Sequence, residues 1–397
     1  MKSAHRDGRA PRAAMASAGP TTTSAIAPVI LRALIALACA GAARADEIEY
    51  SVYYFKDNNE NTVATSAFSL AKTLLEKTLI SLNIEMDQTT VPPLLDGVTG
   101  ASRPSRQSKS EFRKNRGQII GGLEQTLGEN TRVMGKVYFS QEVDYQSLSF
   151  IGGISRDFAQ KNFIVDVRGQ YVMDSVGEIL ANGSILNRFK ETHLGTLNLT
   201  QVLSPTAFVH GCVGLTRIHG FQSDPYRKIE IPTSDPKAPD TVIERHPDMR
   251  WRQVVGLGVN KYLRGIDGAF SIDYKYYWDD WGLASNTAHF QFNKYITKDW
   301  IVSPSYRYYD QAGATYGEYR DGGDATFDTE DYKLKYFGSN GAGLKVACFL
   351  RAFGRKHPAW EFLNNTAVSA EYFHYFNDMV PENFTADLFE TRLRFAF

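Results

Sequence analysis

The chain of 397 residues carries 44 basic and 44 acidic side chains, so its formal net charge at neutral pH is zero. Aromatic residues make up 13% of the chain, although the mean hydropathy is only −0.32. This balance lacks the basic surface of nucleic-acid-binding proteins and argues against nucleic acid as a partner. Three cysteines are too few for a disulfide scaffold, so Cys212 and Cys348 are expected to be free thiols.

An export signal is predicted at the N-terminus. A run of about ten apolar or small residues precedes Ala43-Arg44-Ala45, which places small residues at the two positions that a signal peptidase inspects. The run is too short for a spanning helix. We therefore expect a signal peptide of residues 1–45, cleaved after Ala45, and a single mature domain of residues 46–397. Acylation of Cys39 is the alternative. Cleavage leaves 38 basic and 43 acidic residues, because the signal holds six basic residues and one acidic residue.

The mature chain is a succession of amphipathic segments. In residues 47–54, apolar or aromatic side chains alternate with polar ones, which is typical of a strand with one oily and one polar face. Clusters of turn-forming residues, such as 56–61 and 128–130, separate the segments. In chain order, the predicted strands are 47–54, 62–72, 80–86, 116–127, 133–140, 148–154, 163–171, 193–203, 207–218, 251–263, 269–278, 284–296, 300–311, 332–350, 366–376 and 384–397.

The connections between these strands alternate in length. Short turns are predicted at 128–130, 204–205, 264–267 and 297–299, and long loops at 88–114, 174–190, 220–247 and 312–330. Short periplasmic turns and long extracellular loops are typical of an outer-membrane barrel. Aromatic residues also gather near both ends of the strands, as the two interfaces of a bilayer favour.

These features predict an all-β fold, a transmembrane antiparallel up-and-down β-barrel of about 16 strands, with 14 or 18 as alternatives. Separating 332–337 from 344–350 would give an odd number of strands, which single-chain bacterial barrels do not have. No run of about 18 apolar residues offers a spanning helix. The alternative fold is a soluble β-sandwich with an amphipathic last strand.

The last predicted strand ends in an aromatic residue. Phe397, Phe395 and Leu393 share one face, and Arg394 and Arg392 share the other. A terminal aromatic at the end of such a strand resembles the sorting signal of bacterial outer-membrane barrels, which implies the barrel-assembly machinery as a partner. We expect the three apolar residues to form the assembly signal and to face lipid. The expected location is the outer membrane, where lipid and lipopolysaccharide surround the barrel.

Longer segments carry a family resemblance. They are Leu95–Ser102, Glu244–Arg250, Asp273–Gly282 and the shorter Asp331–Leu334. In combination they resemble a domain-of-unknown-function family of predicted bacterial outer-membrane β-barrel proteins, across nearly the whole mature chain. The family has no established activity to carry over. The resemblance implies at most a link to periplasmic redox proteins as partners.

Trp278, Asp279, Asp280 and Trp281 form the densest group of chemistry-bearing residues. Two carboxylates between tryptophans can bind a cation, or a sugar stacked on the rings. The alternative is a tight outer hairpin, in which the aspartates form the turn and the tryptophans anchor in the headgroup region.

Glu244, Arg245, His246 and Asp248 form a second candidate contact site. One histidine and two acids without a fixed partner do not specify a catalytic or metal site. A loop folded back into the pore by salt bridges is the alternative. No catalytic residue, metal or cofactor is assigned, because the chain holds no Gly-x-Ser-x-Gly, phosphate-loop, Cys-x-x-Cys or His-x-x-x-His pattern.

Charged residues at the positions between the lipid-facing ones are predicted to line the lumen. They include Lys136, Asp166, Arg168, Asp273, Lys275 and His289. Both signs occur, which predicts a polar interior without a filter of one sign. The sequence therefore favours a porin-like channel or an envelope scaffold. The alternatives are an outer-membrane enzyme with an acid–histidine site at the rim or in the lumen, and a surface receptor or adhesin.

Replacing Phe397 by Ala should impair assembly of the barrel and leave the properties of any assembled fraction unchanged, because the terminal aromatic acts as a sorting signal. The amount of heat-modifiable barrel in the outer-membrane fraction measures this effect. Ala396→Ser is the matched control and should assemble normally. Normal assembly of Phe397→Ala would show that the prediction is wrong.

Overall fold

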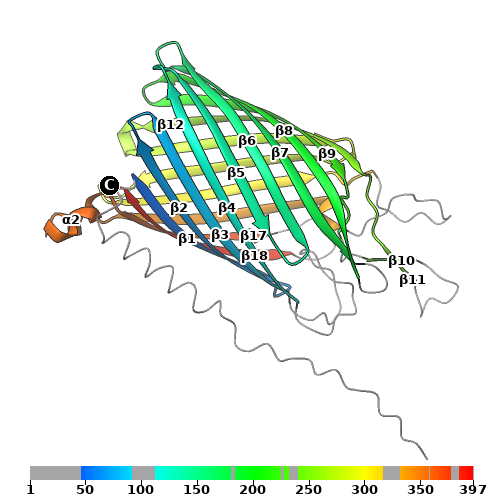
Figure 1. Cartoon of the computed structure of the whole chain (residues 1–397). Helices are drawn as coiled ribbons and strands as arrows, with labels where there is room; N and C mark the ends of the chain where they lie inside the picture. The colour runs from blue at the N-terminus through cyan, green and yellow to red at the C-terminus, as the bar shows by residue number, and fades with distance from the viewer. Residues whose placement is uncertain are drawn as a thin grey trace, which may run out of the picture. The chain divides into compact units, whose positions relative to one another are not determined.

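Sixteen antiparallel strands close into one barrel in the computed structural model, which describes residues 46–91, 112–179, 184–224, 228–231, 240–315, 331–356, 358–376 and 384–396 (Figure 1). The predicted fold class and strand number are thereby confirmed. In chain order, the barrel strands are β1 (Glu47–Asp57), β2 (Thr62–Leu74), β3 (Thr78–Val91), β4 (Phe112–Leu127), β5 (Thr131–Gln141), β6 (Tyr145–Phe158), β7 (Phe163–Ile179), β8 (Ile185–Ser204), β9 (Ala207–Gly220), β12 (Met249–Leu263), β13 (Gly268–Asp279), β14 (Ala284–Tyr295), β15 (Trp300–Gln311), β16 (Phe337–Phe349), β17 (Ala367–Phe376) and β18 (Thr385–Ala396).

The ring closes between the first and last strands. β1 pairs with β18 from Glu47 opposite Ala396 to Asp57 opposite Ala386. The other barrel strands pair in chain order, except that β9 pairs with β12. The small hairpin of β10 (Lys228–Ile231) and β11 (Asp240–Ile243) lies in the connection between those two strands. Because every barrel strand has a partner on both sides, the sheet has no open edge.

The two ends of the barrel differ. The turn end carries the start of β1, the end of β18 and short connections such as 128–130 and 205–206. The loop end carries the β10–β11 hairpin, and Figure 1 shows this hairpin at the end opposite the C-terminus. A short 3₁₀ turn, η1 (Arg264–Ile266), joins β12 to β13 at the turn end.

β7 and β8 extend farther than the sequence predicts. Residues 174–190 were predicted to be a loop, but the two strands remain paired up to Ile179 and Ile185. Cross-strand ion pairs accompany this extension: Lys190 Nζ lies 3.1 Å from Asp174 Oδ2, and Arg188 Nε lies 2.6 Å from Glu178 Oε2. The prediction was wrong because charged and turn-forming residues interrupt the alternation in this segment, although Ile185 and Phe189 are still exposed apolar residues.

The β16 region also departs from the prediction. The expected strand 332–350 begins only at Phe337, after the 3₁₀ turn η2 (Tyr332–Leu334). At the turn end, a single turn was expected at 355–358. Instead, α2 (Arg351–Gly354) and η3 (Pro358–Asn365) form a helical connection. The ring centroids of Phe362 and Phe395 lie 6.3 Å apart, so η3 packs beside the end of β18.

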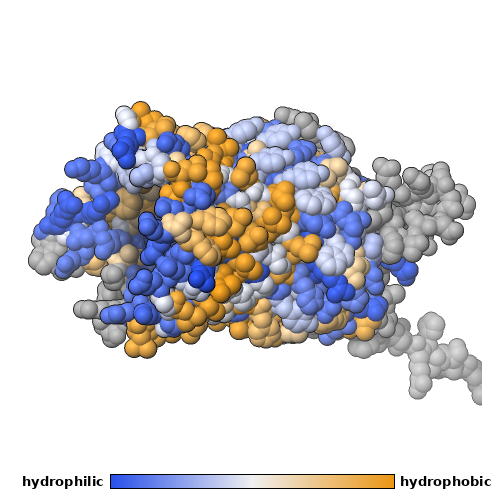
Figure 2. Space-filling view, turned by 90° about the horizontal axis from the view of Figure 1, so that it is seen from above, coloured by the Kyte–Doolittle hydropathy of each residue, from blue (hydrophilic) through white to orange (hydrophobic). Residues whose placement is uncertain are grey.

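The outer face of the barrel is apolar. Leu257 is 66% exposed, Val213 is 52% exposed and Phe389 is 51% exposed. Figure 2 shows apolar side chains gathered over the middle of the visible face, with hydrophilic side chains toward the ends. Water-soluble proteins rarely expose such a continuous apolar surface, whereas lipid favours it. The soluble β-sandwich is therefore excluded.

The inner face is polar and charged. On β18, Leu393 and Phe395 share the outer face with Phe389, whereas Arg392 and Arg394 point inward. Arg394 Nη2 lies 2.7 Å from Glu47 Oε2 across the closing seam. The role of Leu393 and Phe395 in assembly stays a prediction, and Phe397, like Ala45 and the rest of the signal segment, lies outside the described residues.

Two further observations bear on the sequence-based expectations. Cys212 on β9 and Cys348 on β16 are free thiols, as predicted. Within the described part of the chain, no helix is both long enough and apolar enough to cross a membrane.

Leu257→Arg should lower the stability of the barrel in lipid by about 2–4 kcal/mol, because it places a charge on the outer face in the middle of β12. Urea titration of the reconstituted protein measures this change. Thr196→Arg, which adds the same side chain on the inner face of β8, should cost far less. Equal losses for the two variants would contradict the assignment of the faces.

Candidate functional site

Two segments that are far apart in the sequence meet at the loop end. One follows β11 and contains Glu244 and His246, and the other forms the β13–β14 turn with Asp279 and Trp281. The rings of His246 and Trp281 lie 5.3 Å apart. These four residues and Arg250 are called the mouth cluster below. The mouth cluster combines residues of the segment around Glu244 with residues of the segment around Asp279, and the sequence predicts both segments as candidate contact sites.

Arg250 is the charged centre of the mouth cluster. Its Nε donates a hydrogen bond to Asp279 Oδ2 at 3.0 Å, and its guanidinium lies 4.1 Å from the centroid of the Trp281 ring. The Tyr277 hydroxyl donates to the same Asp279 oxygen at 2.6 Å. Arg250 and Asp279 are 6% and 8% exposed. The pair is thus buried with its hydrogen bonds formed, which is the condition that offsets the desolvation of two charges.

The aspartates also build the hairpin. Asp279 Oδ1 accepts hydrogen bonds from the backbone N–H groups of Trp281 and Leu283, at 3.0 and 3.1 Å, which is the chemistry of an aspartate turn. Gly282 has φ of 86°, a left-handed conformation that favours glycine. Asp280 Oδ1 accepts the N–H of Trp251 at 2.9 Å. This arrangement corresponds to the hairpin alternative for the two carboxylates.

The two tryptophans of this hairpin lie on opposite sides of the wall. Trp278 is on the outer face, 37% exposed, and stacks on Tyr276 with ring centroids 5.5 Å apart. Trp281 is 4% exposed and packs with Leu283 and Leu334 in a small apolar core. Trp278 therefore has the position of an interfacial anchor, whereas Trp281 holds the β15–β16 connection against the hairpin.

The Glu244 segment is folded against the wall. Glu244 Oε1 contacts His246 Nε2, and the side chains are 0% and 5% exposed. The backbone N–H of His246 donates a hydrogen bond to Ser223 Oγ at 3.0 Å. The indole Nε1–H of Trp281 donates a hydrogen bond to the Met249 carbonyl at 3.0 Å. Arg245 and Asp248 are exposed and lie outside the mouth cluster. The geometry is that of a loop fastened to the barrel.

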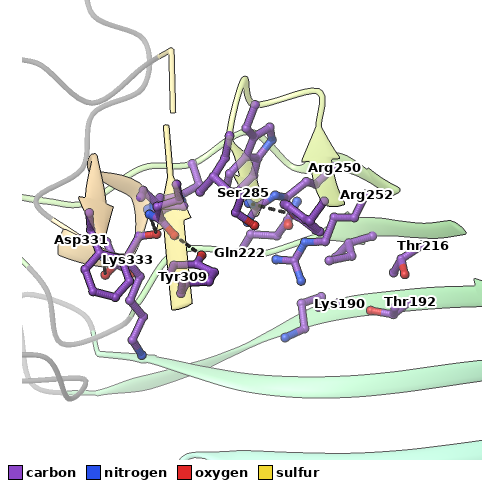
Figure 3. A pocket seen from close by; sticks show the side chains of 18 residues that line it. Lys190, Thr192, Thr216, Gln222, Arg250, Arg252, Ser285, Tyr309, Asp331 and Lys333 are labelled. Atoms are coloured by element: carbon purple, nitrogen blue, oxygen red, sulfur yellow. Dashed lines mark hydrogen bonds between the residues drawn. The ribbon is translucent and has the colours of Figure 1, made fainter. Parts of the chain in front are cut away.

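A cavity of about 790 Å³ opens beside the mouth cluster (Figure 3). Four basic side chains line it: Lys190, Arg250, Arg252 and Lys333. In Figure 3, Lys190 and Arg252 extend from separate strands toward the same space. The carboxylate of Asp331, the His246 ring, and hydroxyl, amide, aromatic and aliphatic groups complete the lining, so this mouth cavity suits a polar solute of moderate size.

A second cavity of about 760 Å³ lies deeper along the same wall, nearer the turn end. β8, β9, β13, β14 and β15 contribute to both cavities. In this lumen cavity, His210 Nε2 lies 2.8 Å from Asp273 Oδ1, and Ser271 Oγ donates to Asp273 Oδ2 at 3.0 Å. A Cβ at Gly258 would lie 2.3 Å from the His210 ring, so glycine makes room for this contact.

The residues that the sequence assigns to the lumen all lie on the inner face by their register. Lys275 and His289 line the lumen cavity with Asp273, and Asp166 pairs with Arg168 at 2.7 Å on β7. The described residues include no group of three or more His, Cys, Asp or Glu side chains that could hold a metal ion.

Sequence reasoning did not single out His210 and Arg307 as lumen residues. Both occupy inward positions on strands that were predicted, so the alternation on β9 and β15 contained their signal. Their proximity to Asp273 and His289 depends on strand register, which the sequence does not display. Arg250 was noted only as part of a family segment, because its burial depends on the fold of the mouth.

A closed antiparallel barrel with an apolar exterior and a polar lumen has the architecture of an outer-membrane β-barrel. The chain belongs to the family described as protein of unknown function (DUF3570), whose model matches residues 96–191 and 180–357, more than half of the chain. The family resemblance seen in the sequence is thereby confirmed. No curated protein matches the chain significantly.

Among solved structures, the similarity to CdiB supports the same fold. CdiB from Acinetobacter baumannii is similar with a TM-score of 0.50 and 9% identity, over 87% of this chain and 60% of that chain. A bacterial polysaccharide outer membrane secretin has a TM-score of 0.49 and 8% identity, over 89% and 99%. The CymD monoaromatic hydrocarbon channel has a TM-score of 0.43 and 10% identity, over 88% of both chains. At such low identity, the similarity concerns the fold alone.

Arg250→Met should destabilise the barrel by about 3–5 kcal/mol, because it leaves the buried carboxylate of Asp279 without its cation. The midpoint of thermal unfolding, followed by heat modifiability, measures the loss. Asp280→Asn is the control, since Asp280 is exposed and asparagine can still accept from Trp251.

The double variant Arg250→Met/Asp279→Asn removes both charges but keeps an oxygen for the backbone N–H groups of Trp281 and Leu283, and should recover much of the lost stability. If Arg250→Met and Asp280→Asn unfold at the same temperature, the mouth cluster does not depend on this ion pair.

Proposed function

We propose that the protein is an outer-membrane, porin-like channel for small polar solutes. The observation that carries the proposal is a closed apolar wall around a polar interior, with cavities of about 790 and 760 Å³ along one side. Barrels of about this strand number are wide enough to leave an aqueous channel. The protein would therefore lower the barrier that the outer membrane presents to hydrophilic molecules.

The charges of the inner wall support a hydrated lumen. Arg132 Nη2 lies 3.0 Å from Asp157 Oδ1 and Arg168 Nε lies 2.7 Å from Asp166 Oδ1, with the arginine side chains 39% and 50% exposed. Ionised groups within a membrane-spanning structure are stable where they face water or one another. An interior lined in this way suits permeation by polar solutes better than a dry structural core.

The proposed orientation places the turn end in the periplasm and the loop end outside the cell. Short turns at the end that holds the start of β1 and the end of β18 are the arrangement of bacterial outer-membrane barrels. Lipid and lipopolysaccharide would then surround the apolar band, and the mouth cavity would open toward the medium. Export would use the predicted signal of residues 1–45, and insertion would use the barrel-assembly machinery.

An outer-membrane enzyme is the second candidate, favoured by one observation in the lumen. His210 lies 2.8 Å from Asp273 and keeps 35% of its side chain exposed toward the cavity, so it has the partner and access that a general base needs. The Glu244–His246 pair is buried and suits a structural role. Hydrolysis of ester or glycoside probes that His210→Gln abolishes would favour the enzyme over a passive channel.

Sucrose-gradient fractionation should place the protein in the outer membrane, and purified barrel should produce stepwise conductance in planar lipid bilayers. Conductance is expected because the charged lumen holds water. The same preparation after boiling is the control and should be silent. Recovery of the protein in the soluble periplasm would contradict the outer-membrane location. A folded barrel without conductance would contradict the channel function and favour a scaffold or a receptor.

A further inference from the structure

We propose that the channel selects for small anionic solutes, and that Lys275 and Arg307 bind their carboxylate or phosphate groups in the lumen cavity. This inference deepens the proposed channel function and rests on it. It names the class of solute and two residues that would determine specificity. The supporting observations are the pairing of charges in the lumen, the strand register and the lining of the lumen cavity.

Most carboxylates of the inner wall are already engaged by cations. The closing seam shows the pattern, since Glu47 pairs with Arg394 and Glu49 pairs with Arg392, at 2.7 and 3.3 Å. Further inward pairs are Asp87–Arg116, Asp157–Arg132, Asp166–Arg168, Asp174–Lys190, Glu178–Arg188, Glu371–Lys345 and Glu390–Arg392. Most of these charges cancel, although Arg392 serves both Glu49 and Glu390, so the field beside each part of the wall depends on the charges left over there.

Lys275 and Arg307 are leftover positive charges, and both line the lumen cavity. Within the described part of the chain, neither Lys275 nor Arg307 has a carboxylate within salt-bridge distance. Asp273 lies on the same strand as Lys275, but its oxygens contact His210 and Ser271 instead. The guanidinium of Arg307 lies 5.2 Å from the Tyr309 ring centroid, which leaves it in the cavity wall.

Other unpaired charges of the inner wall do not reverse this balance. Lys136 on β5 also lacks a salt bridge among the described residues, and β5 is eight strands from β15 in the ring. Glu124 on β4 is an inward carboxylate without one, but it lies near the turn end and does not line the lumen cavity. Lys275 and Arg307 face the single carboxylate of Asp273 in the lumen cavity, so the cavity itself carries excess positive charge.

Strand register brings several donors to one place. Lys275 lies opposite Thr287 on β14, and Arg307 lies opposite His289 on the same strand. All four residues line the lumen cavity, from three adjacent strands that together span about 10 Å. Ammonium, guanidinium, hydroxyl and imidazole groups can donate together to an oxyanion, and charge-assisted hydrogen bonds of this kind are strong.

The mouth cavity does not add to this excess charge. Its cations Lys190 and Arg250 pair with Asp174 and Asp279, and Asp331 also lines the cavity. The excess positive charge therefore belongs to the lumen cavity, where it would concentrate anions and raise their rate of entry.

Reversal potentials across planar bilayers in a potassium chloride gradient test the selectivity. The unaltered channel should pass chloride in preference to potassium. Lys275→Gln/Arg307→Gln should lower the chloride-to-potassium permeability ratio about threefold or more, because the cavity loses its excess charge. Lys161→Gln/Arg264→Gln removes the same charge from exposed turns and should change the ratio little. Lys275→Arg keeps the charge and should retain selectivity.

Binding is tested separately by adding inorganic phosphate or a small dicarboxylate to one chamber. Block of the chloride current by either anion that disappears in Lys275→Gln/Arg307→Gln supports the site, and the anion that blocks identifies the preferred group. Potassium preference in the unaltered channel, an unchanged ratio in the double variant, or no block by either anion would overturn the inference while conductance itself persists. A folded barrel that does not conduct would overturn the channel function as well.

Discussion

The backbone pairing of β1 with β18 is the constraint on which the rest of the barrel depends. In hydrocarbon, each unsatisfied backbone N–H or C=O costs several kcal/mol, so a sheet that spans a membrane must close. The closing pair runs the full length of both strands, from Glu47–Ala396 to Asp57–Ala386. Arg394 also forms an ion pair with Glu47 on the inner face of this seam. This ion pair depends on the register in which the two strands pair.

The register in which the strands pair determines which side chains face the lumen. A slip of one residue would exchange the inner and outer faces of a strand, placing arginines in lipid and apolar residues in water. The same register brings His210 beside Asp273, although they are 63 residues apart in the sequence. It also assembles the lumen cavity from several strands of one wall. The chemistry of the interior is therefore a consequence of the ring, and no local motif contains it.

Much of the fold could be predicted because lipid imposes a simple pattern. On β18, the alternation of Leu393 and Phe395 with Arg392 and Arg394 identifies both faces without any knowledge of the neighbours. The pattern fails where lipid ends. In the extended parts of β7 and β8, charged and turn-forming residues interrupt the alternation, and the β10–β11 hairpin is too short to show a period.

The candidate site could be predicted only in parts. The dense group around Asp279 and the acid–histidine segment around Glu244 were recognisable from residue type, but their meeting at Trp281 was not. Aspartate supports both cation binding and turn formation, and the choice is made by backbone N–H groups that come within reach only once β13 and β14 pair. The excess positive charge on one wall was hidden for a related reason. Basic and acidic residues are both common along the chain, and the strand register determines which of them lie close enough to form ion pairs.

The mouth cluster connects these observations. Burying Arg250 with Asp279 desolvates both charges, so the pair is weak evidence for added stability and better evidence for position. It holds the β13–β14 turn in place, and Trp281 packs between Arg250 and His246, so the segment after β11 lies against the wall. The mouth cavity then opens directly above strands whose deeper residues include Lys275 and Arg307. The segment after β11 is thereby part of the entrance, since His246 and Trp281 both line the mouth cavity.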